Sequence, residues 1–299
     1  MPSAPLKKTE FHNHHFDSTV WNDFAFRNDD IIIATYAKSG TTWVQQIVSQ
    51  LIFNGQENLE VAAMSPWVDL RIPAKAEKLA ALEAQKHRRF IKTHLPVGAL
   101  VFSEKAKYLY IGRDGRNVVW SMYNHHANAN ALWYQLLNDT PGRVGPPIAP
   151  PPADIRQYFH EWLEGDGHPF WPFWENIQSW YDIKDLPNVM LLHFDLLKQD
   201  LPGQICNVAK FLNIPIDESR FDVIVEHCSF DYMKRNAAKS VPLGGAFWDE
   251  GAQTFINKGT NGRWKDVLSQ ADILKYEQEV NKHLTPEAAR WMMTGEVAS

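Results

Sequence analysis

The chain has 299 residues, of which 44% are hydrophobic, and a formal net charge of -5. This length and composition can bury a substantial core, either as one large α/β domain or as two smaller ones. The negative charge gives no overall attraction to nucleic acid or to an anionic membrane, so any anion site must be a local concentration of positive groups. The two cysteines, without a CxxC pair, exclude a disulfide scaffold and disfavour a cysteine-rich zinc site.

The N-terminal segment, residues 1–28, is polar and aromatic, and its first residues lack the apolar core of a signal peptide. No run of the chain approaches the roughly eighteen apolar residues that a membrane span needs. We therefore expect a soluble, cytoplasmic protein. Three aromatic residues are expected to anchor the segment against the rest of the chain: Trp21, Phe24 and Phe26.

Three histidines of this segment, His12, His14 and His15, lie close together in the sequence. They lack the helical HExxH spacing of metalloproteases. We interpret them as solvated surface residues, with a weak metal site as the alternative.

Residues 30–53 predict a strand, a tight loop and a helix. The β-branched run at 31–33 indicates a buried strand, and a helix is expected from Thr42 to about Phe53, where Asn54-Gly55 ends it. This order directs several backbone N–H groups and a helix N-terminus at one point, which suits a phosphate or sulfate. Lys38 adds a cation to this point. The alternative interpretation is an ordinary strand-to-helix turn with a solvated lysine. The loop is not a Walker P-loop, because its lysine precedes its only glycine.

Further strands and helices alternate along the chain. Strands are predicted at 89–96, 107–112 and 189–194, and helices at 75–88, 118–123, 173–181, 196–212 and 269–284. This alternation predicts an α/β fold, a single domain over residues 1–299 with a central parallel sheet flanked by helices. Sites in such sheets lie at the carboxyl ends of strands, so Lys92, Thr93 and His94 are candidates for an active-site rim.

Two segments cannot form regular elements. Residues 138–153 are rich in proline and glycine, and they are either a mobile lid or an inert linker. Residues 255–265 are glycine-rich and basic, and they predict a loop. Between these two segments lie four tryptophans, most of which are expected in the core: Trp162, Trp171, Trp174 and Trp180.

The sequence YAKSGTTW at 36–43 resembles the 5′-phosphosulfate loop of the cytosolic-type sulfotransferases, commonly written YPKSGTTW, with Ala37 in place of proline. Three other family motifs follow in the same order. Lys-Thr-His occurs at 92–94, Arg113 and Ser121 have the family's eight-residue spacing, and the late loop RKGxxGxWK aligns with 257–265. The four motifs together cover most of the chain.

The resemblance implies transfer of a sulfuryl group from 3′-phosphoadenosine 5′-phosphosulfate (PAPS) to a hydroxyl or amine of a small, apolar acceptor, with 3′-phosphoadenosine 5′-phosphate (PAP) as the product and no metal. Such in-line transfer depends on positioning and on charge stabilisation. We expect His94 to be the general base, Lys38 to stabilise the bridging oxygen and Lys92 to neutralise the sulfuryl oxygens. Ser121 is expected to bind the 3′-phosphate and to restrain Lys38. The expected donor-binding residues are Lys38, Ser39, Gly40, Thr41, Thr42, Trp43, Arg113, Ser121, Phe230, Asn257, Lys258 and Gly259.

The sequence also departs from the family pattern. Asn257 replaces an arginine, which removes one charge from the expected 3′-phosphate site, and His193 replaces a tyrosine near the expected adenine site. Of the family's C-terminal dimer motif only Lys265 matches, so a homodimer is left open. A P-loop kinase that uses Asp114 as a Mg²⁺ ligand is one alternative function, and a nucleotide-binding protein without transfer activity is another.

Overall fold

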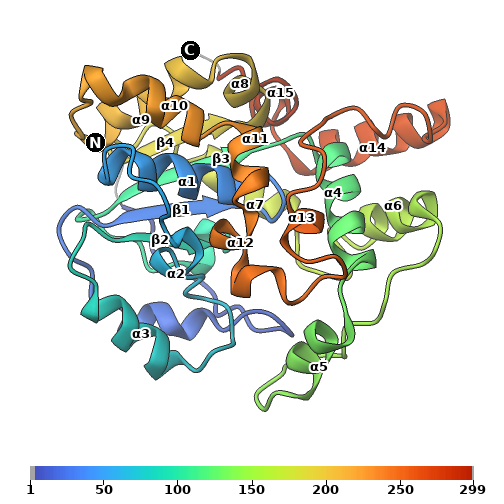
Figure 1. Cartoon of the computed structure of the whole chain (residues 1–299). Helices are drawn as coiled ribbons and strands as arrows, with labels where there is room; N and C mark the ends of the chain where they lie inside the picture. The colour runs from blue at the N-terminus through green and yellow to red at the C-terminus, as the bar shows by residue number, and fades with distance from the viewer. Residues whose placement is uncertain (1–3, 298–299) are drawn as a thin grey trace.

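The computed structural model describes residues 4–297 and is built around a four-stranded parallel sheet (Figure 1). The strands are β1 (Ile31–Thr35), β2 (Phe90–Thr93), β3 (Lys107–Gly112) and β4 (Val189–His193), in the spatial order β2-β1-β3-β4. In the register of the sheet, Ile31 lies between Phe90 and Lys107. The predicted α/β fold with a central parallel sheet is confirmed.

The central strand β1 is buried on both faces, which explains its unbroken apolar sequence. Successive side chains of a strand point to opposite faces. Ile31 and Ile33 accordingly lie in one core cluster, and Ile32 and Ala34 lie in the other.

Helices cover both faces of the sheet (Figure 1). The face of Ile31 and Ile33 packs against α1 (Thr41–Ile52), α8 (Phe194–Gln199), α9 (Leu201–Leu212) and α10 (Phe221–His227). The cluster on the opposite face includes residues from α4 (Gly115–Ala127), α6 (Ile155–Glu164), α7 (Trp174–Tyr181), α14 (Gln270–His283) and α15 (Pro286–Thr294). The remaining α-helices are α2 (Val61–Met64), α3 (Lys75–Ala84), α5 (Ala131–Asp139), α11 (Phe230–Arg235), α12 (Ala237–Ser240) and α13 (Ala252–Phe255).

The prediction of one helix over 196–212 is wrong, because the chain forms two helices there. The side chain of Asp200 accepts a hydrogen bond from the Gly203 amide and so caps the start of α9. Pro202 lies in the first turn of α9, where its missing N–H costs no helical hydrogen bond. The apolar pattern continues across the break, so it does not reveal the boundary. The helices that were not predicted are α2, α5, α6, α10, α11, α12, α13 and α15.

The N-terminal segment contacts the chain after α2. Trp21 and Phe24 are buried, and Phe26 packs partly buried against the same cluster. Phe16 forms a bridge with Leu70, and the Arg71 amide donates to the His15 carbonyl. The interpretation of the histidine cluster as solvated surface is wrong for His14 and His15, since both are buried.

The Pro-rich segment has no helix or strand between the end of α5 and the start of α6. Ile148 within it is buried, and its backbone N–H and C=O both bond to the Asn138 side chain. A lid role for 138–153 stays a prediction. Among residues 4–297, no helix has the length and apolarity needed to cross a membrane.

Candidate active site

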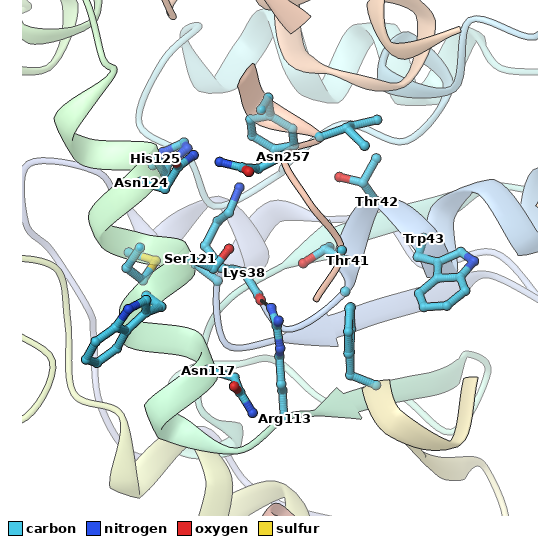
Figure 2. A pocket seen from close by; sticks show the side chains of 18 of the residues that line it. Lys38, Thr41, Thr42, Trp43, Arg113, Asn117, Ser121, Asn124, His125 and Asn257 are labelled. Carbon is cyan, nitrogen blue, oxygen red and sulfur yellow. Dashed lines mark hydrogen bonds between the residues drawn. The ribbon is translucent and has the colours of Figure 1, made fainter. Parts of the chain in front are cut away.

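A pocket opens where β1, β2 and β3 reach their carboxyl ends. These strands lead into Lys38, His94 and Arg113, and all three residues line the pocket. The wall opposite β1 comes from α4 and from the loop after α13, so Ser121, His125 and Asn257 face the same space as Lys38 (Figure 2). Parallel topology therefore brings together motifs that lie far apart in the sequence.

The loop between β1 and α1 forms an anion cradle. Lys38 has a φ of 64° and Gly40 a φ of 120°, and a Cβ atom on Gly40 would lie 2.8 Å from Ile111 Cδ1. Glycine suits this position, because other residues are strained at this φ and their Cβ would displace the Ile111 side chain. In the described part of the chain, the amides of Gly40, Thr41 and Thr42 have no hydrogen-bond partner, as is usual at a helix start. They are donors suited to an anionic ligand at the N-terminus of α1.

Two buried lysines, Lys38 and Lys92, contribute to the positive charge of the pocket. Burial, together with the nearby charges of Lys92 and Arg113, lowers the pKa of Lys38 to about 7. Burial also lowers the pKa of Lys92 to about 8, while Asp69 opposes that shift. Both ammonium groups lie over aromatic rings, Lys38 Nζ at 3.8 Å from the Phe255 centroid and Lys92 Nζ at 4.7 Å from that of Trp67. An anionic ligand would favour the charged form of each lysine.

His94 is held in one orientation by the end of β1. Its Nδ1 lies 2.8 Å from the Thr35 carbonyl oxygen, which can only accept a hydrogen bond, so Nδ1 carries the proton. Burial, with the charges of Lys92 and Lys38, holds the pKa of His94 well below its usual range. The imidazole is therefore neutral, and its Nε2 carries a lone pair instead of a proton. His94 is among the residues that line the pocket.

Asp69 is a buried residue that holds the aromatic rings beside His94 in place. The sequence analysis missed it. Its carboxylate accepts hydrogen bonds from the indole N–H groups of Trp21 (3.1 Å) and Trp67 (2.7 Å). Trp67 in turn packs edge-on against His94, with ring centroids 4.6 Å apart. Asp69 therefore fixes the aromatic wall beside His94 and supplies a negative charge near Lys92.

Arg113 is held by the loop that precedes α14. Its guanidinium donates to Asn261 Oδ1 from Nε (3.0 Å) and from Nη2 (2.5 Å), and to the Lys38 carbonyl from Nη1 (2.9 Å). The guanidinium also lies 4.1 Å from the Phe194 ring centroid. These contacts join the end of β3 to the anion cradle and to the late loop.

Aromatic rings line the side of the pocket next to α1 and α8. Trp43 and Phe194 pack edge to face at 5.5 Å, and the Trp43 indole donates to the Cys228 carbonyl at 2.8 Å. Gly259 has a φ of 61°, and a Cβ atom there would lie 2.6 Å from the Phe230 ring. Glycine at this position therefore lets the late loop pass close to Phe230.

The structure brings most of the predicted site residues to this pocket. Those that line it are Lys38, Gly40, Thr41, Thr42, Trp43, Lys92, His94, Arg113, Ser121, Phe230, Asn257, Lys258 and Gly259. Ser39 is not among the residues that line it; its hydroxyl is buried, without a partner within residues 4–297. No hydrogen bond joins Ser121 to Lys38 in the same residues, so the expected restraint of Lys38 stays a prediction.

The sequence left the roles of His193 and Asp114 open, and the structure shows the contacts of both residues. His193 bonds through Nε2 to the Met292 carbonyl and caps α8, so it is a structural residue, and its neighbour Phe194 lines the pocket instead. The Asp114 carboxylate caps α4 and pairs with Arg116 at 2.6 Å. Among residues 4–297, no group of three or more His, Cys, Asp or Glu side chains is placed to hold a metal ion.

Comparison with known proteins identifies the family. Residues 28–287 match the family described as "Sulfotransferase domain". The "Glycolipid sulfotransferase" of Mycobacterium bovis (strain BCG / Pasteur 1173P2) is 30% identical, over 93% of this chain and 92% of that protein. "Sulfotransferase 1B1" of Mus musculus is 28% identical, over 88% of this chain and 85% of that protein.

Solved structures show the same fold. Mouse sulfotransferase SULT7A1, crystallised with PAP, has a TM-score of 0.69 at 22% identity, over 92% of this chain and 91% of that one. Retinol dehydratase, crystallised with androsterone and PAP, has a TM-score of 0.68 at 21% identity, over 90% and 84%. The chain belongs to the sulfotransferase family, which confirms the resemblance carried by the four motifs and the expected class of enzyme.

Proposed function

We propose that the chain transfers the sulfuryl group of PAPS to a hydroxyl of a small acceptor with an apolar or aromatic body. The observation that carries this proposal is the position of His94, with a bare Nε2 in a pocket that also holds Lys38 and Lys92. A base, two cations and an anion cradle are the groups that sulfuryl transfer needs.

In the proposed reaction the acceptor oxygen attacks sulfur while its proton passes to His94 Nε2. The bond between sulfur and the bridging oxygen breaks, and PAP leaves. Lys38 stabilises the negative charge that builds on the bridging oxygen, and Lys92 neutralises the sulfuryl oxygens. The amides of residues 40–42 bind the 5′-phosphate that becomes part of PAP.

The residues present fit the donor. Within residues 4–297 the cradle at Gly40 has amides without a partner, and Trp43 and Phe230 line the same pocket as aromatic surfaces for an adenine ring. Arg113, Ser121 and Lys258 are the groups proposed for the 3′-phosphate, with Lys258 and Arg263 in place of the charge that Asn257 lacks. We place the reaction in the cytoplasm, because both cysteines, Cys206 and Cys228, are free thiols.

The acceptor class follows from the walls of the pocket. Trp67, Phe170, Trp171 and Phe255 line it, and such rings favour an apolar or aromatic body. Because one relative is named for glycolipids and the pocket is lined by aromatic rings, an acceptor panel should contain both sugars and phenols.

The role of His94 is tested by the variant His94→Ala. Loss of a general base should lower turnover by about 10²–10⁴-fold, while PAP binding measured by calorimetry stays unchanged. The matched control is His87→Ala, since His87 is a histidine outside the pocket. Loss of PAP binding to the same degree as turnover would contradict the assignment.

The donor is tested by comparing PAP with AMP, which lacks the 3′-phosphate. Charge-assisted hydrogen bonds contribute about 1.5–3 kcal/mol each, so removing this phosphate should weaken binding by about tenfold or more. Equal binding of AMP would refute the proposed 3′-phosphate site.

A further inference from the structure

His15 belongs to the N-terminal segment, yet its ring lines the same pocket as His94. The segment is held in place because the Arg71 amide donates to the His15 carbonyl and Phe16 forms a bridge with Leu70. His15 is only 4% exposed. A polar side chain buried among aromatic rings needs hydrogen-bond partners or pays a desolvation cost.

A chain of hydrogen bonds fixes the tautomer of His15. His14 Nε2 lies 2.8 Å from the Pro169 carbonyl oxygen, so Nε2 of His14 carries a proton. In a neutral His14 the other nitrogen, Nδ1, is then an acceptor, and it lies 2.5 Å from Nδ1 of His15. The proton between the two rings must therefore sit on His15 Nδ1. This leaves Nε2 of His15 as a bare acceptor.

Both rings are neutral near pH 7 for physical reasons. Burial lowers the pKa of His14, the hydrogen bond to the Pro169 carbonyl opposes this shift, and the nearby charges of Arg71 and Arg143 add to the lowering. Burial also holds the pKa of His15 well below its usual range, and the groups facing it are His14, His126, His94 and Arg71. For both rings the net shift favours the neutral imidazole.

His15 and His94 contact the same two tryptophans. The ring centroid of Trp67 lies 6.0 Å from that of His15 and 4.6 Å from that of His94. The centroid of Trp171 lies 5.5 Å from His15 and 5.8 Å from His94. His15 and His94 thus present two bare imidazole acceptors beside one aromatic wall, and His94 is the one proposed as the base.

Resting on the proposed function, we propose that the acceptor is a small phenol with a second hydrogen-bond donor, a hydroxyl or an amine, which binds His15 Nε2. The first hydroxyl lies at His94 and is sulfated, while the second positions the ring and selects the substrate. An acceptor without the second donor would leave a buried polar nitrogen unpaired, and sites that bind a substrate hydroxyl reject analogues that lack it. His15 is therefore a specificity-determining residue.

The test compares phenols in pairs that differ only by a hydroxyl in place of a methyl group. Suitable pairs are catechol with 2-methylphenol, resorcinol with 3-methylphenol, hydroquinone with 4-methylphenol, and 4-(2-hydroxyethyl)phenol with 4-propylphenol. With PAPS as the donor, kcat/KM should favour the hydroxylated member of at least one pair by about 10–100-fold. The variant His15→Phe should abolish this preference, and His15→Gln, which retains an acceptor oxygen, should restore part of it.

A control measurement separates the possible failures. PAP binding of both variants should match that of the unaltered protein, because no hydrogen bond among residues 4–297 joins His15 to the cradle or the late loop. Turnover of phenols without a preference within any pair, or a preference that survives His15→Phe, would overturn the role of His15 alone. Absence of turnover for every phenol would overturn the proposed acceptor class as well.

A measurement without turnover tests the same geometry. Nitrogen-15 NMR of the histidine side chains should show His15 as the neutral tautomer protonated at Nδ1, and its Nε2 signal should shift on adding the preferred diphenol together with PAP. The opposite tautomer, or an unchanged signal at saturating diphenol, would refute the inference.

Discussion

The low pKa of Lys38 predicts that PAP binding takes up a proton. Without a ligand, burial and the charges of Lys92 and Arg113 lower this pKa from 10.5 to about 7. The phosphates of PAP supply the missing counter-charge and should return the pKa toward its ordinary value. Lys38 is about half protonated at pH 7 and about one-tenth protonated at pH 8. Binding should therefore take up about 0.5 proton at pH 7 and about 0.9 at pH 8 through this residue alone.

The direction of the pH effect follows from this uptake. The charged lysine is the form that binds, so affinity for PAP should be greatest below pH 7 and should fall as the pH rises above it. One proton taken up per ligand corresponds to a Kd that rises about tenfold per pH unit. Lys92, whose pKa is about 8, adds to the uptake at the upper end of this range.

The assay is calorimetric titration of PAP in buffers of different ionisation enthalpy, between pH 7 and 8.5. The slope of the observed heat against buffer enthalpy gives the number of protons taken up. In the variant Lys38→Met the contribution of Lys38 disappears, and only that of Lys92 and of the ligand remains. An uptake that is the same in the variant as in the unaltered protein would refute the reasoning.

Three further predictions concern residues around the site. The variant Gly259→Ala should weaken PAP binding, because the new Cβ would lie 2.6 Å from the Phe230 ring at a φ of 61°; equal PAP affinity by calorimetry would contradict this steric argument. The variant Asp69→Asn removes the charge that raises the pKa of Lys92, so the basic limb of the pH–rate profile should move to lower pH, and an unmoved limb would exclude this coupling. The variant Asp30→Asn breaks a buried ion pair with Arg89 and should lower the free energy of unfolding by about 3–5 kcal/mol in a denaturant titration; a loss below about 1 kcal/mol would show that the pair contributes no more than an exposed one.

The sequence predicted the parts of the site that depend on local order. The β-branched run before Lys38 and the apolar spacing after it define a strand and a helix. The positions of Lys92, His94 and Arg113 directly after strands then place them at one edge of a parallel sheet. These inferences need only the connectivity of the chain and the direction of the strands.

The sequence could not predict contacts made by distant segments. The burial of His14 and His15 depends on pairing with residues 70–71 and on the Pro169 carbonyl, and neither leaves a local pattern. Asp69 was missed for the same reason, since its partners Trp21, Trp67 and His94 come from three separate segments. At the end of β4, the residue after the strand, Phe194, enters the pocket, while His193 turns toward α15.

The most direct test of the account is a transfer assay with chelated metal. The protein is incubated with PAPS, a panel of phenols and sugars, and an excess of chelator, and the acceptors are analysed by mass spectrometry. We expect at least one phenol to gain the mass of one sulfuryl group, with formation of an equal amount of PAP and with loss of product in His94→Ala. PAP binding without any sulfated acceptor, or product formation that survives in His94→Ala, would contradict the proposed reaction.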